Sequence, residues 1–398
     1  MERGTGAQGS AAEVFRVFLK LGLTSFGGPI AHLGYFRTEC VERRRWLDDR
    51  AYSDLVALCQ FLPGPASSQV GMALGLGRAG WPGLLAAWAG FTLPSAIALI
   101  LFAYGMARYH ELAQSGWVQG LKVAAVAIVA QAVWGMAKAL CPDRPRAALA
   151  VLAALITLAL PSAPGQMVAI LVAGLSGWWW LGRAPASGGA AHAYPVSRRL
   201  GAAALLLFAA MLAGLPLAVL VTASPVVALL DGVYRAGALV FGGGHVVLPL
   251  LQATVVPPGF VGNAEFLAGY GAAQAVPGPL FTFAAYLGAV ADGVLGGWAG
   301  GLVLLGAIFL PALLVLIGVL PFWEALRHRV GMRAAMAGVN AGVVGILLSA
   351  LYDPVWVHAI HGKADFGLAL AAFALLVYAR MPPALVVFLS AAAGWVLA

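Results

Sequence analysis

Charged residues are scarce in this chain of 398 residues: Asp, Glu, Lys and Arg together make up only 10%, against roughly 25% in ordinary soluble domains. The mean hydropathy is +0.91 and 62% of the residues are hydrophobic. From Trp81 onward, apolar stretches of the length needed to cross a bilayer, about 20 residues, recur with short polar interruptions. These features predict an all-α polytopic membrane protein and leave no room for a separate soluble domain.

Cysteine is also rare, and common enzyme motifs are missing. Cys40, Cys59 and Cys141 show neither metal-ligand spacing nor a CxxC arrangement, and we interpret them as packing residues. There is no HExxH, GxSxG or P-loop motif and no carboxylate pair inside an apolar segment. We therefore expect no enzyme activity, no cofactor and no metal site. The N-terminal stretch lacks the features of a secretory signal, so we expect it to be retained.

Glycine and proline, in contrast, are abundant and recur in ordered motifs. The stretch KLGLTSFGGPIAHL from Lys20 resembles RAGALVFGGGHVVL from Arg235, and CQFLPGPASS resembles AQAVPGPLFT, which lies 214 residues later. A third pair places Pro94 opposite Pro311. Matches in the same order predict an internal duplication, with repeats at 10–182 and 224–398. Residues 183–223 then form a linker and one connecting transmembrane helix without a counterpart.

One connecting span predicts that the second repeat is inverted relative to the first. Loop 37–50 is rich in arginine, which favours the cytoplasmic side, whereas its counterpart 252–264 has no basic residue, as inverted repeats require. The charges of the other loops agree with this inversion if the FGG and PGP segments are re-entrant, so that each enters and leaves the membrane on the same side. We therefore predict an inner-membrane protein with a cytoplasmic N-terminus. Its nine crossings are 82–107, 118–140, 146–161, 164–182, 199–222, 294–320, 334–352, 366–379 and 382–397, with thirteen spanning segments as the alternative.

The FGG and PGP motifs are expected to break helices within the membrane. Proline cannot donate a backbone hydrogen bond, and glycine tolerates non-helical dihedral angles. Such backbone is tolerated at membrane depth only where protein buries it or where it lines a watery cavity. In transporters, half-helix N-termini face anionic groups. Four breaks in equivalent pairs thus predict one central anion site, with close packing of small residues as the alternative.

Polar residues accompany these breaks. Lys20 and Arg235 occupy equivalent positions, and we predict that together they hold a dianion, with snorkelling to the headgroups as the alternative. Hydroxyl and amide groups after PGP either donate to the anion or satisfy nearby carbonyls, and the two histidines either carry protons or pack. The predicted substrate-binding residues are Lys20, Phe26, Gly27, Gly28, Pro29, His32, Gln60, Pro63, Gly64, Pro65, Ser67, Ser68, Gln69, Arg235, Phe241, Gly242, Gly243, Gly244, His245, Gln274, Pro277, Gly278, Pro279 and Thr282, with Lys122 and Asn340 as second-tier candidates.

With FGGPxAH and PGPxSSQ in the first half and FGGGxVVLP, PGP and FLP in the second, the sequence resembles the chromate ion transporter family in its long, two-domain form. The resemblance implies a secondary transporter of the bacterial inner membrane that exports chromate, a tetrahedral dianion isosteric with sulfate, and confers chromate resistance. It also implies that the motif residues named above are functional. One departure is Ala66, where the family usually has a polar Asn.

Two alternatives remain open. The same fold could take up or exchange sulfate or another oxyanion, since sulfate shares the charge and shape of chromate. A membrane-bound chromate reductase would belong to another class and would need haem, flavin or redox-active thiols. We expect an oxyanion and the lipid bilayer as partners and no nucleic acid; the many small residues suit a homodimer as well as internal packing.

Overall fold

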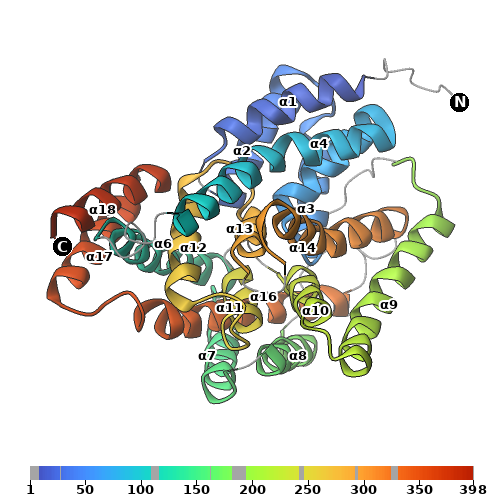
Figure 1. Cartoon of the computed structure of the whole chain (residues 1–398). Helices are drawn as coiled ribbons and strands as arrows, with labels where there is room; N and C mark the ends of the chain where they lie inside the picture. The colour runs from blue at the N-terminus through green and yellow to red at the C-terminus, as the bar shows by residue number, and fades with distance from the viewer. Residues whose placement is uncertain are drawn as a thin grey trace, which may run out of the picture.

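The computed structural model describes residues 9–26, 28–108, 116–161, 163–181, 194–241, 246–291, 295–323 and 330–397. Within these ranges all regular elements are helices and there is no strand, which confirms the predicted all-α fold (Figure 1). The first repeat contains α1 Ala11–Thr24, α2 Gly28–Phe36, η1 Arg37–Arg43, α3 Asp49–Phe61, α4 Ala66–Arg108, α6 Gly116–Leu140, α7 Arg144–Ala159 and α8 Ala163–Trp180. The connecting helix is α9 Arg198–Thr222, and the second repeat contains α10 Pro225–Ala238, α11 Val247–Val255, α12 Asn263–Ala275, η3 Leu280–Thr282, α13 Phe283–Val290, α14 Gly297–Val319, η4 Leu320–Phe322, α16 Val330–Ala350, η5 Leu351–Trp356, α17 Lys363–Val377 and α18 Pro383–Leu397.

Local sequence sets where several helices begin. Side chains of Ser10, Asp48, Asp143 and Ser197 each accept a hydrogen bond from the backbone amide three residues later, which satisfies an amide that the first helical turn leaves free. The four motif breaks appear as predicted: α1 and α10 end before FGG, and α3 and α12 end before PGP.

Among the described residues, five helices are long and apolar enough to cross a membrane: Ala66–Met106, Gly116–Leu140, Arg198–Thr222, Gly297–Phe322 and Ala334–Trp356. Helices also occupy the other four predicted crossings, as α7, α8, α17 and α18, but these have 16, 18, 15 and 15 residues. At 1.5 Å per residue they span roughly 22–27 Å, slightly less than the ~30 Å hydrocarbon core. The count of nine crossings therefore stays a prediction.

The first predicted crossing, 82–107, lies in the second arm of the bent helix α4. Helix α4 runs from Ala66 to Arg108 and bends at Ala79 and Gly80, where the dihedral angles are not helical. Gly80 has φ +65°, a value that costs glycine little and other residues more. The bend divides α4 into two arms that correspond to α13 and α14 of the second repeat.

The two repeats match element by element. Helices α1 and α10 both have 14 residues, α3 and α12 both have 13, and each pair starts 214 residues apart. In the same order α6, α7 and α8 correspond to α16, α17 and α18. Helix α9 has no counterpart; it lies at the edge of the molecule in Figure 1, and only 6% of its apolar window is buried. This helix is a peripheral connector rather than part of the core.

The repeats exchange helices. Helix α6 packs against α17 and α18 of the second repeat, and α16 packs against α7 and α8 of the first (Figure 1). Glycines allow the close approach at both equivalent crossings: a Cβ on Gly394 would lie 2.7 Å from the Cα of Gly120, and a Cβ on Gly177 would lie 2.6 Å from the Cα of Gly338. Such reciprocal contacts interlock the two repeats.

Candidate functional site

The PGP motif of each repeat contacts the FGG motif of the other. The amide of Gly64 donates to the carbonyl of Val240 at 2.7 Å, and the amide of Gly278 donates to the carbonyl of Ser25 at 3.0 Å. Val240 and Ser25 are the residues directly before the two FGG motifs. We call this meeting point, formed by residues 25–26, 28–29, 63–65, 240–241 and 277–279, the motif junction.

The third motif pair lies directly behind the junction. Gly64 has φ +112° and Gly278 has φ +105°, a region in which residues with a Cβ are strained. A Cβ at Gly64 would lie 2.7 Å from the Cβ of Ala312, and a Cβ at Gly278 would lie 2.9 Å from the Oγ of Ser95. Both positions therefore require glycine for conformation and for space. Ser95 and Ala312 follow the repeated prolines at 94 and 311, so all three motif pairs meet here.

Several predicted donors satisfy protein carbonyls at the junction. The amides of Gly64 and Gly278 are occupied by the bonds between the repeats. The side-chain amide of Gln69 donates to the carbonyls of Pro63, at 2.8 Å, and Ala312, at 3.3 Å. The hydroxyl of Thr282 donates to the carbonyl of Pro279 at 2.8 Å. For these groups the structure supports the structural alternative, because they hold the broken backbone in place.

Other predicted donors lie buried beside the junction. His32 is 1% exposed, its Nδ1 lies 3.4 Å from the Oγ of Ser67, and its ring contacts Phe91 edge-on at 5.1 Å. The Nε2 of His32 and the Oγ of Ser68 have no hydrogen-bond partner among the described residues. A buried polar group without a partner is costly, so these two atoms are available to a ligand.

The structure does not bring Lys20 and Arg235 together. Lys20 forms an ion pair with Glu39 at 3.5 Å and is 57% exposed. Arg235 pairs with Asp231 and lines a small pocket, of about 40 Å³, between α8, α10 and α11. Each cation therefore has a carboxylate partner of its own, so a dianion shared between the two cations gains no support.

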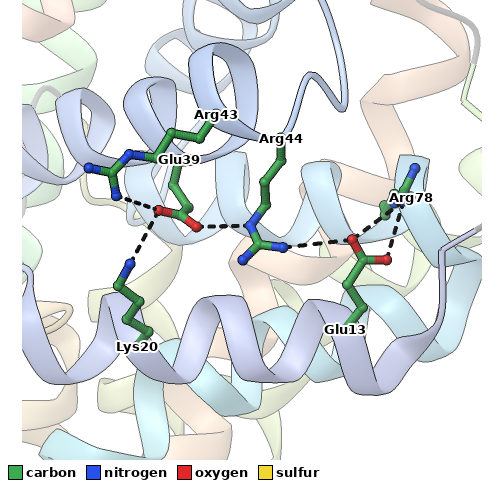
Figure 2. A network of polar contacts seen from close by, with 6 residues as sticks. All are labelled: Glu13, Lys20, Glu39, Arg43, Arg44 and Arg78. Carbon is green, nitrogen blue, oxygen red and sulfur yellow. Dashed lines mark hydrogen bonds and ion pairs between the residues drawn. The ribbon is translucent and has the colours of Figure 1, made fainter.

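Lys20 belongs to a charge network that links α1, η1 and α4 (Figure 2). Glu39, 8% exposed, accepts from Lys20, from Arg43 at 3.3 Å and from Arg44 at 2.8 Å. Glu13 bridges Arg44, at 3.9 Å, and Arg78, at 3.3 Å. Four cations surround two carboxylates, which leaves an excess of two positive charges. We call these residues (Glu13, Lys20, Glu39, Arg43, Arg44 and Arg78) the cationic network.

The protonation of Glu39 follows from this setting. Burial opposes the charged form, but the hydrogen bond from Arg44 and the charges of Lys20 and Arg44 outweigh it, so the pKa of Glu39 lies below its usual value. Glu39 thus stays ionised and holds α1 and η1 together. Our sequence reasoning missed Glu13, Glu39 and Arg78 because it considered only charges beside the motifs.

The remaining predicted residues fall into four groups. Gln60 is exposed at the end of α3, whereas Gln274 is half-buried with an amide nitrogen that lacks a partner among the described residues. Phe26, Phe241, Gly28, Pro29, Pro65 and Pro277 form part of the junction backbone. Lys122 and Asn340 are half-buried in α6 and α16. Gly27, Gly242, Gly243, Gly244 and His245 lie outside the described residues. Within the described residues, no group of three or more His, Cys, Asp or Glu side chains is placed to hold a metal ion.

The fold and the junction define a class: a membrane protein built from two interlocked repeats whose broken helices meet at the centre, as in many secondary transporters. The particular family follows from comparison. The family model described as chromate transporter matches residues 12–178 and 227–395, and the chain belongs to this family.

Relatives agree with that membership. The chain is 29% identical to a chromate transport protein of Pseudomonas aeruginosa, over 86% of this chain and 81% of that protein. It is 28% identical to a chromate transport protein of Cupriavidus metallidurans, over 84% and 80%, and 25% identical to an uncharacterized transporter of Methanocaldococcus jannaschii, over 85% and 83%. No solved structure matches the chain.

Proposed function

We propose that the chain exports chromate across the bacterial inner membrane, that the substrate passes the motif junction, and that this export confers chromate resistance. The observation that carries the proposal is the pair of backbone hydrogen bonds by which each PGP glycine meets the other repeat. Broken helices buried between two repeats are where transporters bind their substrates. Family membership supplies the substrate class.

The few hydrogen bonds at the motif junction would also allow the two repeats to move relative to each other. Among the described residues, one backbone hydrogen bond on each side connects PGP to the opposite FGG, at Gly64 and at Gly278. A net hydrogen bond contributes only about 0.5–1.5 kcal/mol, so rocking of the repeats could exchange one such contact for another at little cost. In our proposal the repeats have inverted topology, and the motif segments open alternately to the two sides.

The cationic network is proposed to attract the substrate from the cytoplasm. It includes Glu39, Arg43 and Arg44 of loop 37–50, and the arginine content of this loop predicts the cytoplasmic side. Its two most exposed cations are Lys20 and Arg43, with side chains 57% and 63% exposed. An excess of two positive charges raises the local concentration of a dianion. Lys20 lies five residues before Ser25 on the chain, about 7.5 Å along a helix, so an attracted anion arrives close to the junction.

Flux measurements in vesicles of both orientations test this function. Everted vesicles that contain the full chain should accumulate radiolabelled chromate, and vesicles without the protein should not. Uptake only into right-side-out vesicles would favour the alternative of oxyanion uptake, with sulfate competition showing the preferred ion. Equal chromate levels in vesicles with and without the protein, in both orientations, would refute transport.

A further inference from the structure

The two equivalent sides of the motif junction differ in chemistry. Around the contact between Gly278 and Ser25, the first repeat supplies four hydroxyl residues, Ser25, Ser67, Thr92 and Ser95, which we call the hydroxyl cluster. The aligned residues of the second repeat are Val240, Phe281, Phe309 and Ala312. Although the backbone is equivalent on both sides, these four positions carry hydroxyl groups only in the first repeat.

Contacts place the hydroxyl cluster in one small region. The carbonyl of Ser25 accepts from the amide of Gly278, and a Cβ on that glycine would lie 2.9 Å from the Oγ of Ser95 and 3.1 Å from the carbonyl of Phe91. Thr92 precedes Ser95 by one turn on the same helix face, and its carbonyl accepts from the Ser95 hydroxyl at 3.1 Å. Ser67 is joined through His32, whose ring touches Phe91.

Two of these hydroxyls are buried without a partner. Ser25 and Thr92 are both 0% exposed, and neither the Oγ of Ser25 nor the Oγ1 of Thr92 has a hydrogen-bond partner among the described residues. Leaving a buried hydroxyl unpaired costs about 1–3 kcal/mol. Two such groups beside one broken backbone therefore indicate a place for an acceptor that is not part of the chain.

Thr92 differs from the other helical threonines in this respect. The hydroxyls of Thr157, Thr222 and Thr254 each donate to the carbonyl four residues earlier, at 2.9, 2.7 and 2.8 Å, which is the common solution inside a helix. Thr92 lacks this bond, so its hydroxyl is free to point elsewhere. Thr157 is also buried and serves as a matched control.

We propose that the hydroxyl cluster forms the donor side of an asymmetric oxyanion site, in which Ser25 and Thr92 donate to the oxygens of a tetrahedral dianion. This inference rests on the proposed transport function and names the residues that set its affinity. A tetrahedral oxyanion has only acceptor atoms, so hydroxyl donors match it on several sides. The second repeat contributes the backbone of Gly278.

The test uses the full chain in proteoliposomes, with labelled chromate flux measured against concentration. The isosteric variant Thr92→Val removes the hydroxyl alone, and because hydrogen bonds to charged groups contribute about 1.5–3 kcal/mol, its KM should rise roughly 10-fold or more. Thr92→Ser restores the donor and should stay near the wild-type KM, and Thr157→Val should leave KM unchanged. Ser25→Ala should raise KM as Thr92→Val does.

A binding measurement separates this inference from transport itself. Chromate should raise the unfolding temperature of the purified wild type and of Thr92→Ser, but raise that of Thr92→Val much less. If the wild type transports chromate and Thr92→Val shows the same KM and the same shift, the hydroxyl cluster is not the donor side. Binding with this pattern but without flux would support the site and refute transport. No shift for the wild type would overturn the site.

Discussion

Replacing Gly64 with alanine adds one methyl group to the motif junction. This substitution should weaken the contact between the repeats more than a methyl group added at any other position of the junction. The residue has φ +112°, and holding a residue with a Cβ in so sparsely populated a conformation costs about 1–3 kcal/mol. The new Cβ would lie 2.7 Å from the Cβ of Ala312, which is fully buried and has no space to yield. Overpacking of this kind costs about 1–3 kcal/mol more.

The sum, about 2–6 kcal/mol, is a large share of the 5–15 kcal/mol typical of folded proteins. Gly64→Ala should therefore unfold at a clearly lower temperature in detergent and lose most chromate flux in vesicles. The control is Gly105→Ala in α4, where an added Cβ meets nothing within 4 Å and alanine favours the helix by about 1 kcal/mol. If Gly64→Ala matched Gly105→Ala in unfolding temperature and flux, the contact inferred between the PGP motif of one repeat and the FGG motif of the other would be wrong.

Three further predictions concern charge and topology. Lys20→Ala should weaken the chromate protection of cells, because it removes one of the two most exposed cations of the cationic network, while immunoblots still find the protein in the membrane. Arg235→Ala should weaken protection less, because Arg235 pairs with Asp231 outside that network; full protection with Lys20→Ala would remove Lys20 from the transport path. Glu39→Gln should lower the free energy of unfolding by about 1 kcal/mol, because the cations around Glu39 are largely exposed, and so should lower the unfolding temperature slightly. Because folding lowers the pKa of Glu39, the stabilisation by its carboxylate is present above the usual pKa and is lost as the pH falls through the pKa of the folded state. Acidification should therefore make the unfolding temperatures of the wild type and Glu39→Gln converge. A difference that stays constant with pH would contradict this. A cysteine placed in loop 252–264 should react with impermeant reagents from the periplasm, and labelling from the cytoplasm would exclude the inverted topology.

The repeat motifs predicted the helix breaks well because glycine and proline act locally. Neither FGG nor PGP can continue a regular helix, so the ends of α1, α3, α10 and α12 follow from the sequence alone. The apolar stretch likewise predicted a crossing that begins at residue 82, and the structure bends just before it, at Ala79 and Gly80 of α4.

Contacts between the repeats could not be predicted from their alignment. Aligning Lys20 with Arg235 shows that the two positions are equivalent, and equivalence under a two-fold axis does not mean proximity. For the same reason, nothing in the sequence indicated that Gly64 would meet Val240 rather than the FGG of its own repeat. Long-range pairing depends on how the helices pack, which the motifs do not encode by themselves.

Three of the four residues of the hydroxyl cluster were missed because our sequence reasoning sought residues shared by both repeats. Ser25, Thr92 and Ser95 have apolar partners at the aligned positions, so a search for matching pairs passes over them. A search for polar residues in one repeat opposite apolar residues in the other would have found them. Asymmetry between duplicated halves is thus a signal of its own.

Substrate protection of a single cysteine tests most directly whether an oxyanion binds at the motif junction. Ala66→Cys, in a background without Cys40, Cys59 and Cys141, places a thiol at the start of α4 directly after PGP. Sulfate shares the charge and shape of chromate without oxidising thiols, and it should slow labelling of Ala66→Cys, whereas planar nitrate should not. A labelling rate unaffected by sulfate, in protein that still transports an oxyanion, would place the binding site elsewhere.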